Sequence, residues 1–151
     1  MLNTAGPSMP RAARGFTLIE TLVSLLVISI GLLGVLGMRI ASLKTTANAN
    51  ARATASVHAA DMLDRLRANP VRATFGEFNL SLLAATPTNP ATIAQQDLSQ
   101  WRGSLSANLA NGLGSVQVDP DGQATIVVQW TERDDTLAQG RGYTFTFRSR
   151  L

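Results

Sequence analysis

The sequence has 151 residues, of which 45% are hydrophobic and 15% charged, and its formal net charge is +3. It contains no cysteine, which excludes disulfides, thiolate nucleophiles and metal sites built on cysteine. Two of the arginines lie within residues 1–15, and subtracting them leaves a charge of +1, so we expect no nucleic acid among the partners.

Residues 1–15 combine two arginines with two prolines and contain no apolar core. In an ordinary secretory signal the apolar stretch precedes the cleavage site, whereas here the small residue Gly15 precedes it. Cleavage after the apolar stretch is therefore not indicated, and we predict that this stretch stays in the mature protein. Either Met1 or Met9 can serve as the initiator, because both arginines follow Met9.

An apolar stretch runs from Leu18 to Met38. As a helix, at about 1.5 Å per residue, it reaches about 30 Å, the thickness of the hydrocarbon core of a bilayer. We predict a transmembrane or filament-core helix over residues 16–38. Arg11 and Arg14 favour a cytoplasmic N-terminus, with the bulk of the chain on the other side of the membrane. Three basic residues on the far side weaken that orientation signal: Arg39, Lys44 and Arg52.

Glu20 is the one carboxylate in this stretch, and a carboxylate near the end of a membrane helix costs up to about 3 kcal/mol if it lies in hydrocarbon. Two interpretations remain open from physical chemistry. Thr17 and Glu20 have the spacing of a capping box, in which Glu20 only satisfies amides at the start of the helix. Alternatively, Glu20 pairs with a cation of another chain, and a free α-amino group at a neighbouring N-terminus is the most natural candidate.

The segment Gly15-Phe16-Thr17-Leu18-Ile19-Glu20, between a short basic leader and an apolar helix, resembles the class III signal of type IV pilins and pseudopilins. The resemblance implies that a prepilin peptidase cuts between Gly15 and Phe16 on the cytoplasmic side and methylates the new amino group, giving N-methylphenylalanine. It also implies that Glu20 aligns each subunit with the N-terminus of its neighbour during filament assembly.

Three glycines recur at intervals of three in the apolar stretch: Gly31, Gly34 and Gly37. Major pilins usually carry a proline where this chain has Gly37, which is a departure from the family pattern. Glycine is common in membrane helices, where it allows close helix approach. It also weakens a helix by about 1 kcal/mol relative to alanine, so helix flexibility during filament entry is the second interpretation.

Apolar and small residues continue at intervals of three and four as far as Leu66, and Pro70 then ends the helical pattern. We predict one helix about 75 Å long, from Leu18 to Ala68. Residues 39–69 would be its periplasmic half, and residues 70–151 a globular head.

The head is expected to hold a loop over 70–91, a short helix over about 92–110 and strands over about 115–119, 124–131 and 142–149. Its core should contain the large aromatic residues of these elements: Trp101, Trp130, Tyr143, Phe145 and Phe147. The predicted class is α+β, with a long helix on a small antiparallel sheet, which is the architecture of type IV pilins.

Within the pilins, the chain most resembles PilV-type minor pilins. The similarity lies in Ser29-Ile-Gly-Leu-Leu-Gly, in residues 61–69 at the helix end, and in the spacing of Leu98, Trp101 and Trp130. It implies a low-abundance subunit of the type IV pilus, or fimbrium, that helps prime pilus assembly. This role is compatible with a location at the pilus tip. The implied partners are the prepilin peptidase, other minor and major pilins, the inner-membrane assembly platform and the lipid bilayer.

Two other functions stay open. A minor pseudopilin of a type II secretion system is built from the same parts, and a membrane-anchored adhesin or DNA-uptake receptor belongs to a different class. Neither an enzyme nor a cofactor-binding protein is expected, because the single His58 has no partner for acid–base or metal chemistry. Two aspartate pairs could hold Ca²⁺, but a turn and an exposed loop explain them equally well: Asp119 with Asp121, and Asp134 with Asp135.

Overall fold

The computed structural model describes residues 15, 17–134, 137 and 139–151. The chain divides into two compact units, Met1–Ala41 and Ser42–Leu151. Helix α1 (Leu18–Ala68) has 51 residues and contributes to both units. In the first unit, α1 is the described helix, and its side chains are exposed along its whole length.

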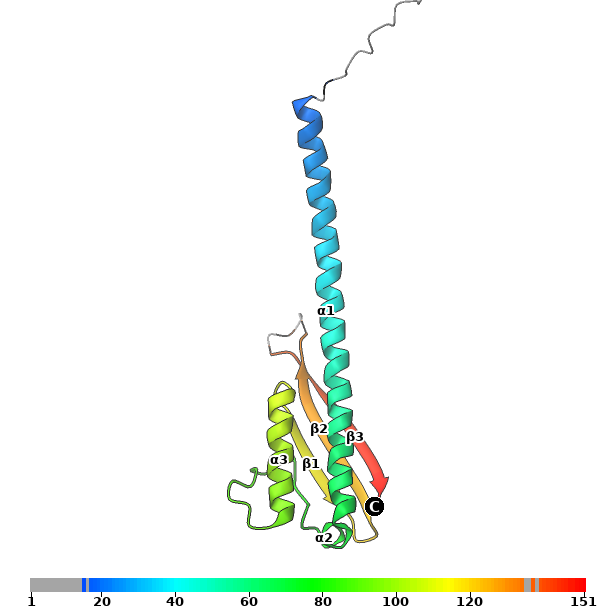
Figure 1. Ribbon diagram of the computed structural model, residues 1–151, viewed down its shortest axis with the longest axis vertical. Coiled ribbons are helices and arrows are strands. Elements are labelled where there is room, and N and C mark those ends of the chain that lie inside the picture. The colour runs from blue at the N-terminus through cyan, green and yellow to red at the C-terminus, as the bar shows by residue number, and fades with distance from the viewer. Residues whose placement is uncertain (1–14, 16, 135–136, 138) are drawn as a thin grey trace, which may run out of the picture. The chain divides into compact units, whose positions relative to one another are not determined.

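The second unit is an α+β head (Figure 1). The C-terminal part of α1 is followed by the short helix α2 (Pro70–Thr74) and by α3 (Ile93–Asn108). Three strands complete the head: β1 (Leu113–Val118), β2 (Gln123–Glu132) and β3 (Arg141–Arg150). The sheet is antiparallel with the order β1-β2-β3, so strands that are consecutive in sequence lie side by side.

Local sequence explains how these elements begin and end. Thr92 caps α3 by accepting a hydrogen bond from the Gln95 N–H at 3.2 Å. Asp119 to Gly122 form the turn between β1 and β2, and the φ of +83° at Gly122 is one that glycine adopts without strain. At the outer side of β1, Leu80 and Val116 exchange two backbone hydrogen bonds of 2.8 and 2.9 Å, which cover part of that edge.

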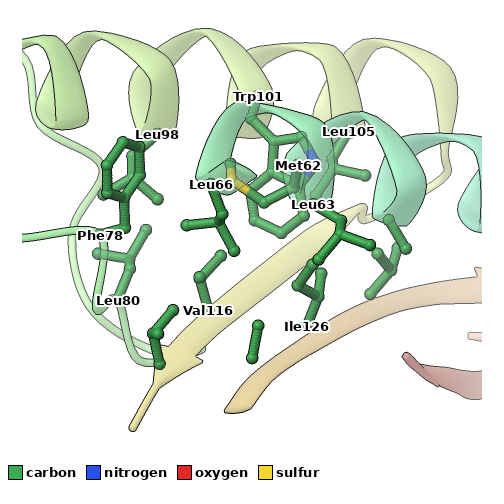
Figure 2. Packing of buried hydrophobic residues seen from close by; sticks show 14 of the residues in the cluster. Met62, Leu63, Leu66, Phe78, Leu80, Leu98, Trp101, Leu105, Val116 and Ile126 are labelled. Carbon is green, nitrogen blue, oxygen red and sulfur yellow. The ribbon is translucent and has the colours of Figure 1, made fainter. Parts of the chain in front are cut away.

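The core lies between one face of the sheet and the two longer helices (Figure 2). α1 contributes Met62, Leu63 and Leu66, and α3 contributes Leu98, Trp101 and Leu105. The alternate residues of β2 point into the same cluster: Ala124, Ile126, Val128 and Trp130. The Trp101 indole N–H donates to the His58 carbonyl at 2.9 Å, which joins α3 to α1.

The predicted fold class is confirmed: a long N-terminal apolar helix packs on a small antiparallel sheet. Two details differ from the sequence analysis. Residues 70–74, expected in a loop, form α2, because Pro70 suits the first turn of a helix, where its missing N–H is not needed. Strand β1 begins at Leu113 rather than near 115, since Gly114 pairs with Val128 and leaves room for the Trp101 ring.

Candidate processing and assembly site

Thr17 holds the start of α1. Its hydroxyl accepts a hydrogen bond from the Glu20 N–H at 3.3 Å, and its carbonyl accepts from the N–H groups of Glu20 and Thr21 at 3.1 and 3.2 Å. Thr17 thus supplies one half of a capping box. The other half, a bond from the Thr17 N–H to the Glu20 carboxylate, is not formed in the described part of the chain. The Glu20 carboxylate therefore takes no part in capping the helix.

The Glu20 side chain is exposed and has no ion-pair partner among the described residues. Gly15 is exposed just before the helix. Phe16, the other residue of the predicted cleavage site, lies outside the described residues. Glu20 therefore lies in the first turn of α1, close in sequence to the predicted cut, and no described residue forms an ion pair with it.

The first unit presents a continuous apolar surface. Every large apolar side chain from Leu18 to Ile40 is at least 48% exposed. The most apolar window of α1 has a mean hydropathy of 2.4, so the helix is long and apolar enough to cross a membrane by length and composition. Such a helix fits a single-pass inner-membrane anchor.

The hydroxyl groups of the apolar stretch, Leu18 to Met38, are satisfied within the helix. The side chains of Thr21, Ser24 and Ser29 each donate to a backbone carbonyl three or four residues earlier, at 2.7–2.8 Å. They need no water and are compatible with hydrocarbon around the helix. Glu20 is consequently the one residue of the apolar stretch whose polar group is left without a partner in the described chain.

Gly31, Gly34 and Gly37 all lie within α1, and a Cβ added at any of them would meet nothing within 4 Å. Gly114 in β1 is different, because a Cβ there would collide with the Trp101 ring. Packing inside the described chain therefore explains Gly114 but does not require the three helix glycines. Close approach of a partner helix and local helix flexibility both remain explanations for them.

The comparison with protein families identifies residues 10–36 as a match to the description "Prokaryotic N-terminal methylation motif". The chain carries the class III signal of type IV pilins. The match covers the predicted cleavage site, Glu20 and most of the apolar stretch. No curated protein and no solved structure matches the chain.

This class III signal supports a type IV pilin or pseudopilin in general. It implies processing by a prepilin peptidase and association with other pilins. Proteins that carry the motif are structural proteins rather than enzymes.

The five aromatic residues singled out in the sequence fall into two groups. Trp101 and Trp130 are buried, at 0% and 4% exposure. Tyr143, Phe145 and Phe147 are half-buried and pack against the edge of the core. Tyr143 stacks on Trp130 with the ring centroids 6.2 Å apart, which links β3 to β2.

Sequence reasoning missed Arg102, which is 6% exposed. Its guanidinium donates to the carbonyls of Ser81, Leu82, Ala84 and Gly114, at distances from 2.5 to 3.0 Å. Burial lowers the pKa of Arg102 below its ordinary value. Arg102 links the loop after α2 to β1, because the N–H groups of its planar guanidinium donate to carbonyls of both segments at once. Its place beside Trp101 on the apolar stripe of α3 is the signal that could have revealed it.

Glu132, at the end of β2, was also missed; it is 3% exposed. It accepts two hydrogen bonds from Arg52 of α1, at 2.9 and 3.0 Å, and one from the Trp130 indole N–H at 3.2 Å. The hydrogen bond from Arg52 holds the pKa of Glu132 below its ordinary value of 4.5. The alternation of β2, which buries Trp130 two residues earlier, places Glu132 on the same inward side.

The other titratable candidates hold no catalytic or metal arrangement in the part of the chain that the structure describes. His58 is half-buried in α1, and its carbonyl receives the Trp101 N–H. Asp119 belongs to the β1–β2 turn, and Asp134 forms an ion pair with Arg141 at 3.1 Å. Asp135 lies outside the described residues.

Proposed function

We propose that the chain is a filament subunit that acts as a minor pilin of the type IV pilus and helps to prime pilus assembly, with a place at or near the pilus tip. The observation that carries the proposal is the exposed Glu20 carboxylate, one turn into an apolar helix and without a partner in the described chain. Near the end of a membrane helix this charge costs up to about 3 kcal/mol if it lies in hydrocarbon, so the helix gains by bringing it to a cation.

Cleavage after Gly15 would create such a cation at the α-amino group of Phe16. Methylation leaves this amino group positively charged, and a subunit that enters the filament beside an earlier one can place Glu20 next to it. A charge-assisted pair inside a water-poor helix bundle is stronger than the same pair in water. This pairing supports an assembly role for the N-terminal helix. Gly31, Gly34 and Gly37 would let the helix flex as the subunit enters the filament.

The minor-pilin role rests on the resemblance of the helix end and the head to PilV-type sequences. Under the same proposal, the N-terminus is cytoplasmic before assembly, the head is periplasmic, and the subunit later reaches the cell surface in the pilus. A minor pseudopilin of a type II secretion system would share the same N-terminal chemistry.

Deletion of the gene tests the proposal when surface pili, twitching motility and protein secretion are scored together. We expect a loss of surface pili and of twitching, with secretion at the wild-type level. Restoration by the full-length gene on a plasmid is the control. A secretion defect with normal pili would contradict the minor-pilin assignment and favour the pseudopilin, and normal pili, twitching and secretion would contradict both.

A further inference from the structure

Strand β3 forms an open edge of the sheet. It pairs with β2 over ten residues, from Gln123↔Arg150 to Glu132↔Arg141, without a bulge. Within the described residues, no backbone group of another element pairs with the outer side of β3, and only at its end does the Arg150 carbonyl accept hydrogen bonds, from the side chains of Arg67 and Ser149. Every second residue of β3 therefore points its N–H and C=O away from the sheet. At the opposite edge, Leu80 already pairs with β1.

The middle of this edge lacks the usual protection against strand pairing. Natural edge strands are commonly protected by a bulge, a proline or a charged side chain at their centre. Residues 143–147 of β3 contain no proline, glycine or charged residue, and their register is regular. This five-residue segment is suited to receive another strand by backbone pairing.

The side chains of the same segment are incompletely covered. Tyr143, Phe145 and Phe147 point toward the core side of the sheet but remain half-buried. Phe145 and Phe147 stack with centroids 6.5 Å apart, and among the described residues of the head no strand lies beyond them. A further strand would place its own side chains beside these rings, since directly opposite residues on paired strands have Cβ atoms about 5 Å apart.

The charges of β3 indicate what kind of strand fits. Arg141, Arg148 and Arg150 lie toward its ends, and the strand has no carboxylate. Arg141 is paired with Asp134, whereas Arg148 is exposed and has no partner in the described chain. Two copies joined through β3 would align two arginine-rich strands without a compensating carboxylate, which is unfavourable. An acidic strand would be attracted to the same edge.

We propose that the β3 edge binds an extended strand of a different filament subunit, one that carries acidic residues near the end facing Arg148. This inference rests on the proposed role as a filament subunit. It assigns a specific partner surface to the head, in addition to the contacts made by the N-terminal helix.

The variant Arg148→Glu tests this charge complementarity, with Arg133→Glu as the matched control. Both arginines are exposed and have no partner in the described chain, but Arg133 follows β2 and lies outside β3. With the full-length variants expressed in cells, we expect Arg148→Glu to lower the amount of the chain in the filament fraction about tenfold, equivalent to about 1.4 kcal/mol. Arg133→Glu should stay within about twofold of wild type.

The outcomes separate this inference from the proposed function. Equal incorporation of both variants and wild type would overturn the β3 proposal and leave the filament role intact. Increased self-association of Arg148→Glu, measured by light scattering in detergent, with no loss from filaments would instead favour pairing of two copies and also overturn it. Failure of the wild type itself to enter filaments would contradict the proposed function.

Amide hydrogen exchange provides a second measurement that needs no substitution. The wild-type chain is compared in detergent and in isolated filaments. We expect the outward amides within residues 143–147 to exchange at least about tenfold more slowly in filaments, because they gain backbone partners. The α3 amides, which already bond within their helix, serve as the internal reference. Unchanged exchange across 143–147 would contradict strand addition.

Discussion

Replacing Glu20 by alanine is expected to lower the amount of the chain in filaments by at least about tenfold, while membrane insertion stays at the wild-type level. The substitution removes a costly charge from the apolar stretch, so insertion should not suffer. It also removes the group that would pair with the new amino terminus of a neighbour, and a loss of about 1.4 kcal/mol is enough for a tenfold change. Quantitative immunoblots of membrane and filament fractions measure both effects.

Ser24→Ala is the matched control, because Ser24 lies one turn further along the same exposed helix and bonds only to the Glu20 carbonyl. We expect it to enter filaments normally. If Glu20→Ala also enters filaments normally, the Glu20 carboxylate acts only within its own helix, and the assembly role assigned to it is wrong. Cleavage of both variants must be checked in the same samples, so that a processing defect is not read as an assembly defect.

Replacing Glu132 by glutamine is expected to destabilise the head by about 2 kcal/mol at pH 7, since charge-assisted hydrogen bonds contribute about that much. Glutamine keeps the size of the side chain but loses its charge and one of the two oxygens that Arg52 binds. The two tryptophans of the chain, Trp101 and Trp130, both lie in the head, so their fluorescence during urea unfolding of the full chain in detergent reports on the head.

The pH dependence follows from the direction of the pKa shift. The pKa of Glu132 is lower in the folded head than its ordinary value of 4.5, because the carboxylate accepts hydrogen bonds from Arg52. Its contribution to the free energy of unfolding is therefore complete above pH 4.5 and is lost as the pH falls through the folded pKa. The difference between wild type and Glu132→Gln should shrink correspondingly at pH 3.

Asp121→Asn is the control for this experiment, because it makes the same charge change in an exposed turn. It should alter the free energy of unfolding by less than about 0.5 kcal/mol. The ion pair with Arg52 does not stabilise the fold if Glu132→Gln has the same free energy of unfolding as wild type at pH 7. The same conclusion follows if the difference between the two proteins is as large at pH 3 as at pH 7.

The fold class could be predicted because each element carries a local pattern. The apolar run beginning at Leu18, the helical spacing that continues to Leu66 and the alternation in β3 each depend on neighbours in sequence. The turn at Asp119 to Gly122 indicated that β1 and β2 are adjacent. Local patterns of this kind determine the type of each element and the side that it buries.

The partners of Arg102 and Glu132 could not be predicted, because they are distant in sequence. Glu132 pairs with Arg52, which lies 80 residues earlier. Arg102 binds carbonyls of the loop after α2, whose path has no periodicity that would reveal it. In both cases the sequence could place a charged residue on an inward-facing side, but only the tertiary arrangement supplies the groups that compensate it.

At the candidate site, the sequence indicated Gly15, Phe16 and Glu20 through a motif, and the structure adds one physical fact. Thr17 caps the helix without engaging the Glu20 carboxylate, which leaves that carboxylate available for a partner. The partner of that carboxylate belongs to another molecule under our proposal, and a single chain contains no pattern from which its position could be derived.

The most direct measurement is the identity and mass of the first residue of the polypeptide isolated from native membranes or filaments. The filament-subunit account predicts that it begins at Phe16 and carries one added methyl group, and that Gly15→Arg leaves the leader attached. A native chain that still begins at Met1 or Met9, or one cut after the apolar stretch, would contradict the account, because the amino group assigned to Glu20 would then be absent.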